Sequence, residues 1–491
     1  MTQNRLKVAV IGAGIGGLAA AIRLARAGLL VEVFEQAAHP GGKIREFRQE
    51  GFRFDTGPSL FTLPELVDEL LDDELKFDYR KLDVITKYFF EDGTQLTAYA
   101  DVNQFAGEVA QKTDIPASSV LDYLEQAGKI YQLTAPVFIF NSFHRLGKLL
   151  TWQNLKRLVQ FFRLKAFSTL HQTNTQAFPD KRLVQLFDRY ATYNGSNPYK
   201  TPGTLSVISH LEHQLGAYFP KQGMYKIVSS LFEQARGLGV QFHFSTSVSQ
   251  LLVRNRQLVG IRVNEKERDF DCVVCDIDIH QFYSNLFPDK KRLQKIERME
   301  RSSSALIFYW GMKKRFPQLD LHNIFFSENY EEEFACLFEK KTISNDPTVY
   351  VFISSKEIKT DAPDGMENWF VMVNAPAHVG QDWTKLEAQV RQTIIKKLNR
   401  RLGEKLEEQI LFEKVLDPVK IEDLTGSFQG AMYGSSSNSP FAAFNRHANF
   451  RHDLPGVYFV GGSVHPGGGI PLCLSSAKIV AEMVEEKIKR S

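Results

Sequence analysis

Cysteine is scarce in this chain. Only four cysteines occur among 491 residues, too few for a disulfide framework in a protein of this size. Cys272 and Cys275 form a lone C-x-x-C within DFDCVVCDID, a run typical of a buried strand, in which positions i and i+3 point to opposite faces. Because there is no second C-x-x-C, a zinc site is unsupported, and we expect two ordinary buried thiols and no metal.

Long hydrophobic runs are also absent. No stretch of about 18 uncharged apolar residues occurs, so we expect no helix that spans a bilayer. The first residues, MTQNRLK, lead directly into a strand-like run without the apolar region of a signal peptide, and we expect an intracellular, cytoplasmic protein. The composition is that of a globular protein, and a net charge of +3 argues against a general binder of polyanions.

Acidic residues are missing from one long segment. Between residues 126 and 179 there is no Asp or Glu, but there are many aromatic residues and seven basic ones: Lys129, Arg145, Lys148, Lys156, Arg157, Arg163 and Lys165. Apolar residues recur at helical spacing, at Leu155, Leu158, Val159, Phe162 and Ala166. A basic amphipathic helix with Trp and Phe is typical of contact with an anionic membrane, at about 1 kcal/mol per basic residue. The alternative is a core helix with a solvated basic side; without a recognised binding module, we expect no nucleic acid.

What the sequence does contain begins at its N-terminus. The β-branched run KVAVI (Lys7–Ile11) meets GAGIGG and then LAAAIRLARAG, which favours a helix, and VEVFE follows as the next strand. This order places G-x-G-x-x-G in the strand–turn–helix–strand context of a dinucleotide site, with Glu35 18 residues after the last glycine.

Each residue type in this motif has a physical task. Gly12 makes the tight turn, Gly14 lets the backbone approach a pyrophosphate, and Gly17 lets the helix pack closely on the strand. The helix N-terminus attracts phosphates. Glu35 can accept hydrogen bonds from a ribose hydroxyl pair, and its charge would repel a 2′-phosphate. The sequence therefore predicts an α/β fold with a Rossmann-like dinucleotide site.

Two further glycine clusters favour FAD over a nicotinamide. Pro40-Gly41-Gly42-Lys43 closely follows Glu35, as suits a longer ligand. Near the C-terminus, a strand at 457–460 meets a glycine-rich loop and a helix that starts near Pro471, which offers a second helix N-terminus. Each cluster alone is compatible with a simple turn, but their order suits one extended cofactor. Because no second complete fingerprint follows a strand, we expect electrons to come from the substrate and not from NADPH.

Motifs spread over nearly the whole chain are similar to those of one family. They are GAGIGGLAAAIRLARAG with Glu35, HPGGK, GFRFDTGPSLFTLP (51–64), YNGSNPY (193–199), YFPKQGMYKIV (218–228), VVCDIDIHQFYSNL (273–286) and VGGSVHPGGGIPL (460–472). The chain resembles the FAD-dependent carotenoid desaturases of the bacterial phytoene desaturase type. The first motif is shared by many flavoproteins, whereas HPGxGIP is more specific. FDTGPSLFTLP and RYATYNGSNPY are most similar to the branch that introduces a 3,4 double bond into 1-hydroxycarotenoids.

The resemblance implies FAD as the cofactor. Carried over motif by motif, it implies these FAD-binding residues: Gly12, Ala13, Gly14, Gly16, Gly17, Glu35, Gly42, Lys43, Gly57, Pro58, Ser59, Val248, Gly461, Gly462, Gly469, Ile470 and Pro471. Val248 matches the position whose backbone meets the adenine.

Two departures from the family pattern stand out. A Gly-Gly pair is common where this chain has Lys221-Gln222-Gly223, and Asn-Ala-Asp is common where it has Cys275-Asp276-Ile277-Asp278. We expect neither departure to touch the cofactor motif, and we expect both to alter the substrate end.

The resemblance also implies the domain organisation. A discontinuous FAD-binding domain (1–100, 218–285 and 426–491) would enclose a helical, membrane-facing segment (101–217) and a substrate-binding domain (286–425). The run VQFHFSTSVSQL, near 240–251, alternates apolar and polar residues, which predicts a half-buried strand.

The implied reaction is desaturation of an acyclic polyene. The flavin would take a hydride from one saturated carbon while a proton leaves its neighbour, and the electrons would pass to a quinone or to oxygen. A polyene is insoluble in water, so we expect attachment to the inner face of the membrane through 126–179. His465 is the candidate proton acceptor, and Arg189 is the candidate contact for a hydroxylated end group. The alternative for His465 is a structural hydrogen bond. The alternative for Arg189 is an ion pair with a neighbouring carboxylate such as Asp188.

Other activities on the same fold remain open at this point. They are a phytoene- or lycopene-type desaturase, a carotenoid isomerase, a carotenoid oxygenase, an amine oxidase and a non-catalytic escort protein for isoprenoids. No aromatic cage for an amine can be identified in the sequence. The intact set of Gly12, Gly14, Gly17 and Glu35 argues against an escort protein, because lipid escorts of this fold bind without flavin.

Overall fold

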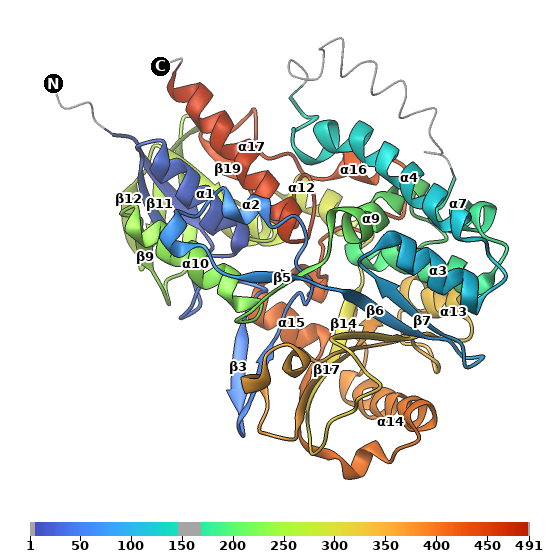
Figure 1. The fold of residues 1–491 in the computed structure, drawn as a ribbon. Coiled ribbons are helices and arrows are strands. Elements are labelled where there is room, and N and C mark those ends of the chain that lie inside the picture. Colours follow the sequence, from blue (N-terminus) through green and yellow to red (C-terminus); the bar gives the residue numbers. More distant parts are fainter. Residues whose placement is uncertain (1–4, 146–167, 490–491) are drawn as a thin grey trace.

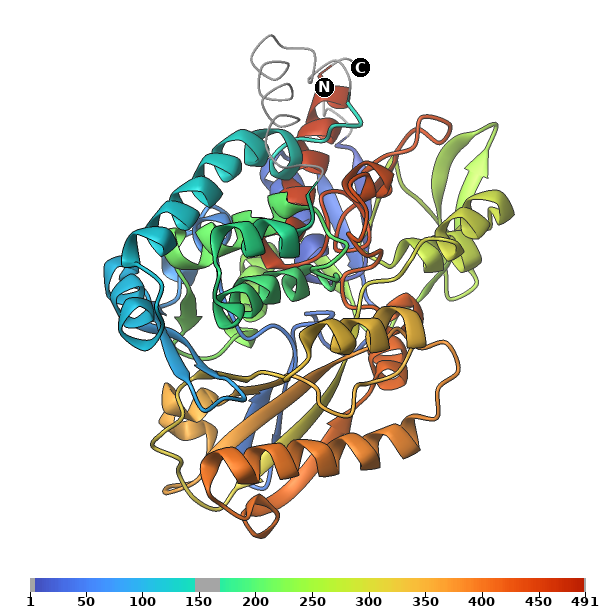
Figure 2. The ribbon, with the colours of Figure 1, turned by 90° about the vertical axis from the view of Figure 1, so that its right-hand side faces the viewer.

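The computed structural model describes residues 5–145 and 168–489. It contains two units built on β-sheets, with a group of helices beside them (Figures 1 and 2). The α/β class expected from the sequence is confirmed.

The first unit is built around a five-stranded parallel sheet. Its strand order is β19-β13-β1-β2-β9, with the bounds β1 (Lys7–Ile11), β2 (Leu30–Phe34), β9 (Gln241–His243), β13 (Cys272–Cys275) and β19 (Val457–Phe459). Three helices lie on one face of this sheet: α1 (Ile15–Arg26), α10 (Tyr225–Gly237) and α17 (Ile470–Ile488). Helix α1 packs against both α10 and α17. A three-stranded antiparallel sheet covers the other face, with strands β10 (Val248–Arg254), β11 (Gln257–Val263) and β12 (Lys266–Asp269).

Strand β1 shows why these runs form buried parallel strands. Val8 and Val10 pack into the cluster shared with α1 and α17, whereas Ala9 and Ile11 pack with Leu251 of β10. Both faces of the strand are therefore covered, as a continuous apolar run predicts. The two thiols of β13 are free and buried and belong to opposite clusters, Cys272 to that of Val8 and Cys275 to that of Ala9.

The single strand predicted near 240–251 is wrong. The segment forms β9 in the parallel sheet and β10 in the antiparallel sheet, separated by a turn in which Ser245 has φ of 51°. The turn is held by backbone hydrogen bonds from Ser245 N–H to Ala37 O and from Thr246 N–H to Glu35 O. The alternation continues through this turn, so periodicity alone cannot detect it.

The second unit is a seven-stranded sheet in the order β18-β14-β17-β16-β15-β6-β7. Neighbouring strands are antiparallel except β15 and β6, and the bounds are β6 (Val84–Phe89), β7 (Gln95–Tyr99), β14 (Ser304–Met312), β15 (His322–Phe325), β16 (Val349–Phe352), β17 (Glu367–Ala375) and β18 (Ile410–Leu416). Helix α14 (Trp383–Leu402) packs on one face, where Trp310 and Ile394 belong to the same buried apolar cluster. On the other face, Tyr309 contacts the hairpin β3 (Glu46–Gln49) and β4 (Phe52–Asp55) through Phe47 and Phe54.

One predicted domain boundary does not follow the sheets. Strands β6 and β7 lie within 1–100, the first part of the predicted FAD-binding domain, yet β6 pairs with β15 of the seven-stranded sheet. The division into domains stays a prediction, and this pairing moves its first boundary to before residue 84.

The segment between residues 101 and 217 is mainly helical where the structure describes it. Its helices are α3 (Val102–Lys112), α4 (Ala117–Thr134), α7 (Leu170–Ala177), α8 (Lys181–Asp188) and α9 (Val207–His210). The predicted basic amphipathic helix, with Leu155, Lys156 and Arg163, lies outside the described residues. Within residues 5–145 and 168–489, no helix has the length and apolar character needed to cross a membrane.

Shorter elements connect these units. They are α2 (Glu65–Asp68), β5 (Tyr79–Lys81), β8 (Tyr218–Pro220), α11 (Ile279–Gln281), α12 (Lys290–Glu297), α13 (Tyr330–Ala335), α15 (Pro418–Thr425) and α16 (Ala442–Asn445).

Candidate cofactor site

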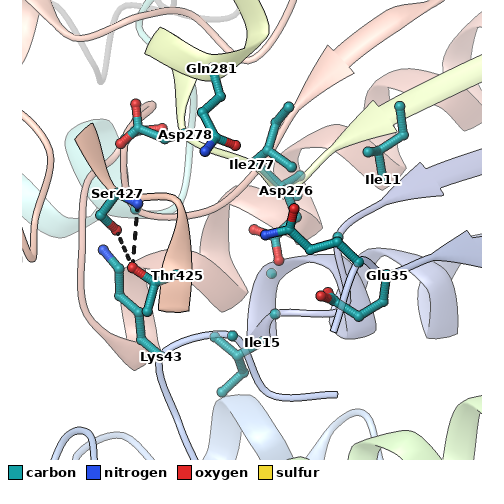
Figure 3. Close-up of a pocket in the computed structure, with 18 of the residues that line it drawn as sticks. Ile11, Ile15, Glu35, Lys43, Asp276, Ile277, Asp278, Gln281, Thr425 and Ser427 are labelled. Carbon is teal, nitrogen blue, oxygen red and sulfur yellow. Dashed lines mark hydrogen bonds between the residues drawn. The ribbon is translucent and has the colours of Figure 1, made fainter. Parts of the chain in front are cut away.

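A cavity of about 380 Å³ opens at the carboxyl ends of the parallel strands (Figure 3). Residues that directly follow β1, β2, β13 and β19 line it, namely Gly12, Glu35, Asp276 and Val460. This is the edge at which open parallel sheets bind ligands. Figure 3 shows Glu35 and Asp276 on one side and Lys43 on the other, beside Thr425 at the end of α15 and Ser427 just after it.

The turn between β1 and α1 has no room for a side chain at Gly12 or Gly17. Gly12 has φ of +101°, and a Cβ on Gly17 would lie 2.2 Å from the carbonyl oxygen of Gly12. Helix α1 begins at Ile15, and its N-cap, Gly14, offers no side-chain cap. The N-terminus of α1, at Ile15 and Gly16, therefore lies at the cavity wall, where it would attract an anion.

Glu35 is held in place by the backbone. Its carboxylate accepts hydrogen bonds from Ala13 N–H at 2.7 Å and from Ala37 N–H at 2.8 Å. A carboxylate offers about four lone-pair sites, so this anchoring leaves acceptor capacity for a pair of hydroxyls. This hydrogen bond also holds Ala13 close to the cavity, although Ala13 itself does not line the cavity.

Lys43 brings a positive charge into the cavity. Its ammonium group donates to Met432 O at 2.6 Å, and the surface that it exposes faces the cavity. Burial lowers its pKa, and the nearby acidic groups of Asp278, Cys473 and Asp276 oppose this shift.

The C-terminal loop forms the opposite wall. Gly462 and Gly469 line the cavity, Gly469 with φ of +112° at the N-cap of α17, and Ile470 and Pro471 open that helix. Gly461 N–H donates to Ser476 Oγ at 2.9 Å, which binds the loop to α17. Two helix N-termini, those of α1 and α17, thus face one cavity.

Some of the expected cofactor residues lie elsewhere. Val248, at the start of β10, lines the cavity, but Gly57, Pro58 and Ser59 do not. A Cβ on Gly57 would lie 2.2 Å from Lys43 O, so Gly57 supports the loop behind the wall. Ser59 shares a hydrogen bond of 2.6 Å with the hydroxyl of Tyr350 in the seven-stranded sheet.

Asp276 does touch the cofactor motif, contrary to the expectation from the sequence. Its carboxylate accepts a hydrogen bond from Gly17 N–H at 2.7 Å, so this departure touches the cofactor motif directly. Asp278 also lines the cavity. Nothing local in the sequence indicates that β13 lies beside β1, which brings residue 276 to residue 17.

Other residues of the cavity were missed altogether. They belong to loops without a recognisable motif: Thr246, Ser247, Gln281, Thr425, Ser427, Met432, Gly434 and Cys473.

His465 does not line the cavity. Its Nε2–H donates to Asn141 O at 2.9 Å, because a carbonyl can only accept, and its ring contacts Phe143 edge-on. The residue is buried, and burial lowers its pKa to about 4, which leaves the imidazole neutral near pH 7.

Arg189 lies in a buried polar cluster away from this cavity. Its guanidinium donates to Tyr88 Oη at 2.7 Å, Tyr193 Oη at 3.1 Å and Glu212 at 3.0 Å. Burial opposes its charge, but Tyr193, Tyr88 and Glu212 raise its pKa well above the usual value. Its ion pair is therefore with Glu212 and not with Asp188, which binds His171.

The groups around the cavity fit FAD. An anchored carboxylate suits a ribose, two helix N-termini and a lysine suit a diphosphate, and glycines keep the walls thin. A Cβ on Gly42 would lie 3.3 Å from Gly14 Cα, so side chains there would close the channel between them.

Comparisons with known proteins agree with this chemistry. The profile of a family described as flavin containing amine oxidoreductase matches residues 15–484. The chain is 47% identical over 482 residues to a 1-hydroxycarotenoid 3,4-desaturase from a Flavobacterium species, covering 97% of this chain and 99% of that protein. It is 29% identical over 495 residues to a 4,4'-diaponeurosporene oxygenase from Staphylococcus haemolyticus, covering 98% of this chain and 97% of that protein.

Solved structures show the same fold. A putrescine oxidase mutant superimposes with a TM-score of 0.64 at 15% identity, with 99% of each chain covered. An oxidoreductase from Methanosarcina mazei gives a TM-score of 0.65 at 15% identity, covering 97% of this chain and all of that one. The fold, the cavity and the sequence similarity agree: the chain belongs to the flavin-containing amine oxidoreductase family, in its carotenoid desaturase group, and is an FAD-dependent oxidoreductase.

Proposed function

We propose that this enzyme desaturates acyclic carotenoids and introduces the 3,4 double bond of a 1-hydroxycarotenoid. The observation that carries the proposal is the 47% identity, over 97% of the chain, to a protein named for that reaction. A phytoene- or lycopene-type desaturase and a carotenoid isomerase are further alternatives, and the similarity to a diaponeurosporene oxygenase favours an oxygenase as the second candidate. The glycine cradle, formed by Gly14, Gly16, Gly17 and Gly461, supports a flavin enzyme over an isoprenoid escort, and so does the anchored Glu35.

The residues of the cavity would bind and orient the cofactor. FAD, when bound, supplies hydride acceptance. Glu35 would accept the ribose hydroxyls, and the N-terminus of α1 together with Lys43 would face the diphosphate. Glycines on both walls would let the backbone approach the cofactor closely.

We propose that His465 positions the C-terminal loop and does not accept the proton. A general base must lie within hydrogen-bond reach of the proton that it removes, whereas the His465 ring donates to Asn141 outside the cavity. His465→Gln keeps a donor for the Asn141 carbonyl. An unchanged product profile in this variant would support the positioning role, and loss of turnover with full FAD content would contradict it.

We propose that Arg189 binds the hydroxylated end of the substrate. The guanidinium is buried and its Nε–H has no hydrogen-bond partner, so it can donate to a hydroxyl oxygen. Arg189→Lys keeps the charge but removes this donor. We expect the preference for hydroxylated over non-hydroxylated carotenoid to fall roughly tenfold, by about 1–2 kcal/mol for one hydrogen bond. Arg182→Lys, at a partly buried ion pair with Asp180 on the same chain segment, is the control, and an equal effect of both changes would contradict the assignment.

We propose that the segment 126–179 attaches the enzyme to the inner face of an anionic membrane, where a quinone or oxygen receives the electrons. Support comes from its seven basic residues and from the absence of acidic ones. The measurement is flotation with vesicles that contain anionic lipid. Equal recovery with neutral and anionic vesicles would contradict the electrostatic attachment.

Pigment analysis tests the reaction. The chain is expressed in cells that make phytoene, lycopene or 1-hydroxylated acyclic carotenoids, and products are identified by absorbance and mass. We expect loss of two hydrogens and a red shift with the hydroxylated substrate alone. Loss of hydrogens from phytoene or lycopene would assign the other desaturase branch, a gain of oxygen would assign an oxygenase, and an unchanged mass with altered double-bond geometry would assign an isomerase.

A further inference from the structure

Asp276 occupies the centre of the glycine cradle. It follows β13 directly, and its N–H donates to Ile11 O at 2.8 Å, which fixes the backbone beside β1. A Cβ on Gly14, Gly16 or Gly461 would lie 2.5, 2.8 or 2.2 Å from one of its carboxyl oxygens. The carboxyl group therefore lies among glycines of both strand–turn–helix units, with Gly17 N–H bound to Oδ2.

A carboxylate at this place conflicts with an anionic ligand. With FAD bound, the cradle would face its diphosphate, and two negative groups in a poorly hydrated space repel each other. The conflict disappears if the carboxyl group is neutral, because a carboxylic acid has an O–H donor besides its acceptor oxygen. It then resembles an amide: one oxygen accepts from Gly17 N–H and the other group donates to phosphate.

We propose that Asp276 is part of the phosphate site and works there as a neutral carboxylic acid, so that FAD binding takes up a proton above neutral pH. This inference goes beyond the proposed reaction and needs only that FAD is the cofactor.

The charges around Asp276 are consistent with this role. Burial and the negative charge of Glu35 raise its pKa to about 7, against the opposing effects of Gly17 N–H and the Lys43 charge. Two other titratable groups line the cavity, Asp278 in the loop after β13 and the Cys473 thiol on α17. Both interact electrostatically with Lys43. The phosphates of FAD would raise the pKa of Asp276 further, because a nearby negative charge disfavours the carboxylate.

Proton linkage fixes the sign of the pH dependence. Below the pKa of the FAD-free protein, Asp276 is neutral in both states and the Kd for FAD is constant. Above it, binding requires protonation, so the Kd rises with pH, by up to about tenfold per pH unit.

The experiment measures FAD release from the holoenzyme. Purified protein is diluted at pH values between about 6 and 9, and released FAD is measured by its fluorescence. For the native chain we expect a Kd that is flat near pH 6 and at least about tenfold higher near pH 8.5. For Asp276→Asn, which keeps both the acceptor and a donor, we expect a flat profile and tighter binding than the native chain at the high end.

Two further variants test whether the pH dependence of FAD binding comes from Asp276 or from its neighbours. Asp278→Asn removes another carboxylate that faces Lys43 and keeps the cap of α11, because its Oδ1 accepts from His280 N–H and Asn caps equally well. It should retain the native slope. Lys43→Arg stays charged throughout this range; it should also retain the slope, whereas deprotonation of Lys43 as the cause would make it flat.

The outcomes are distinguishable. A native chain that binds FAD with a flat profile, or an Asp276→Asn variant with the native slope, overturns the inference and leaves the proposed reaction intact. Thermal unfolding shows that each variant is folded. A folded native chain that binds no FAD at any pH would overturn both the inference and the proposed function.

Discussion

Gly17 has very little room at the cofactor cavity. A Cβ there would lie 2.2 Å from Gly12 O and 3.1 Å from Asp276 Oδ2. The first atom belongs to the backbone of a tight turn and the second to a side chain that is hydrogen-bonded to Gly17 itself. Neither neighbour can move without disturbing the glycine cradle.

Gly17→Ala should therefore lower both stability and FAD content. Forcing a methyl group into this contact costs about 1–3 kcal/mol in the free energy of unfolding. Denaturant unfolding and the flavin absorbance per protein chain measure the two effects. Gly107→Ala is the matched control, because it lies in α3 with nothing within 4 Å of its Cβ position and should be neutral or stabilise by up to about 1 kcal/mol. Similar losses in both variants would refute the steric argument.

At the scale of elements, the C-terminal loop and the π-helical turn at Ala135–Ile139 hold one another. Ser475 Oγ donates to Ile139 O, and His465 donates to Asn141 O. These bonds join the start of α17, which forms part of the cavity wall, to the segment that leads toward the basic residues beyond position 145. The contact is sensitive to pH because His465 is neutral when folded and has its pKa lowered to about 4.

This contact should weaken in acid. The ordinary pKa of His is about 6.5, so unfolding takes up a proton between about pH 6.5 and 4, and stability falls as the pH falls. His465→Gln keeps the donor but cannot be protonated. Relative to this variant, the native chain should lose about 1.4 kcal/mol per pH unit in that range, reaching roughly 3 kcal/mol near pH 4. Denaturant unfolding at several pH values measures this difference, and a constant difference would show that His465 is not buried in its neutral form.

For the whole molecule, one buried arginine ties the two sheet-based units together. Arg53 on β4 pairs with Asp55 at 2.8 Å and with Asp361 at 3.1 Å, and its carbonyl accepts from Asn368 of β17. Asp55 in turn accepts from the N–H of Met224 at the start of α10. The cluster thus runs from the cofactor unit to the seven-stranded sheet.

Breaking this cluster should destabilise the whole protein. Asp361→Ala removes one partner of a buried ion pair, which costs about 3–5 kcal/mol; the remaining partners of Arg53 place the expected loss at the lower end of this range. Asp364→Ala removes the exposed partner of Arg315 and should change stability by about 0–1 kcal/mol. Unfolding followed by both far-UV circular dichroism and flavin fluorescence is the measurement. A negligible effect of Asp361→Ala would show that the units are held together by apolar packing alone.

The sequence by itself determined the β1–α1–β2 unit, its glycines and the place of Glu35. These features are local: a buried apolar run, a turn that needs glycine and a helix follow one another within about one supersecondary unit. The two thiols of β13 and the family also followed from residues read in order, because alternation and motifs are properties of the chain.

Tertiary structure decided everything that depends on which distant strands become neighbours. The pairing of β13 with β1 brought Asp276 to Gly17, and the pairing of β6 with β15 moved residues 84–99 into the second unit. The partner of Arg189 proved to be Glu212, 23 residues away, and not the adjacent acid. Such contacts arise from burial of apolar faces shared by remote segments, and no local periodicity specifies which faces will meet.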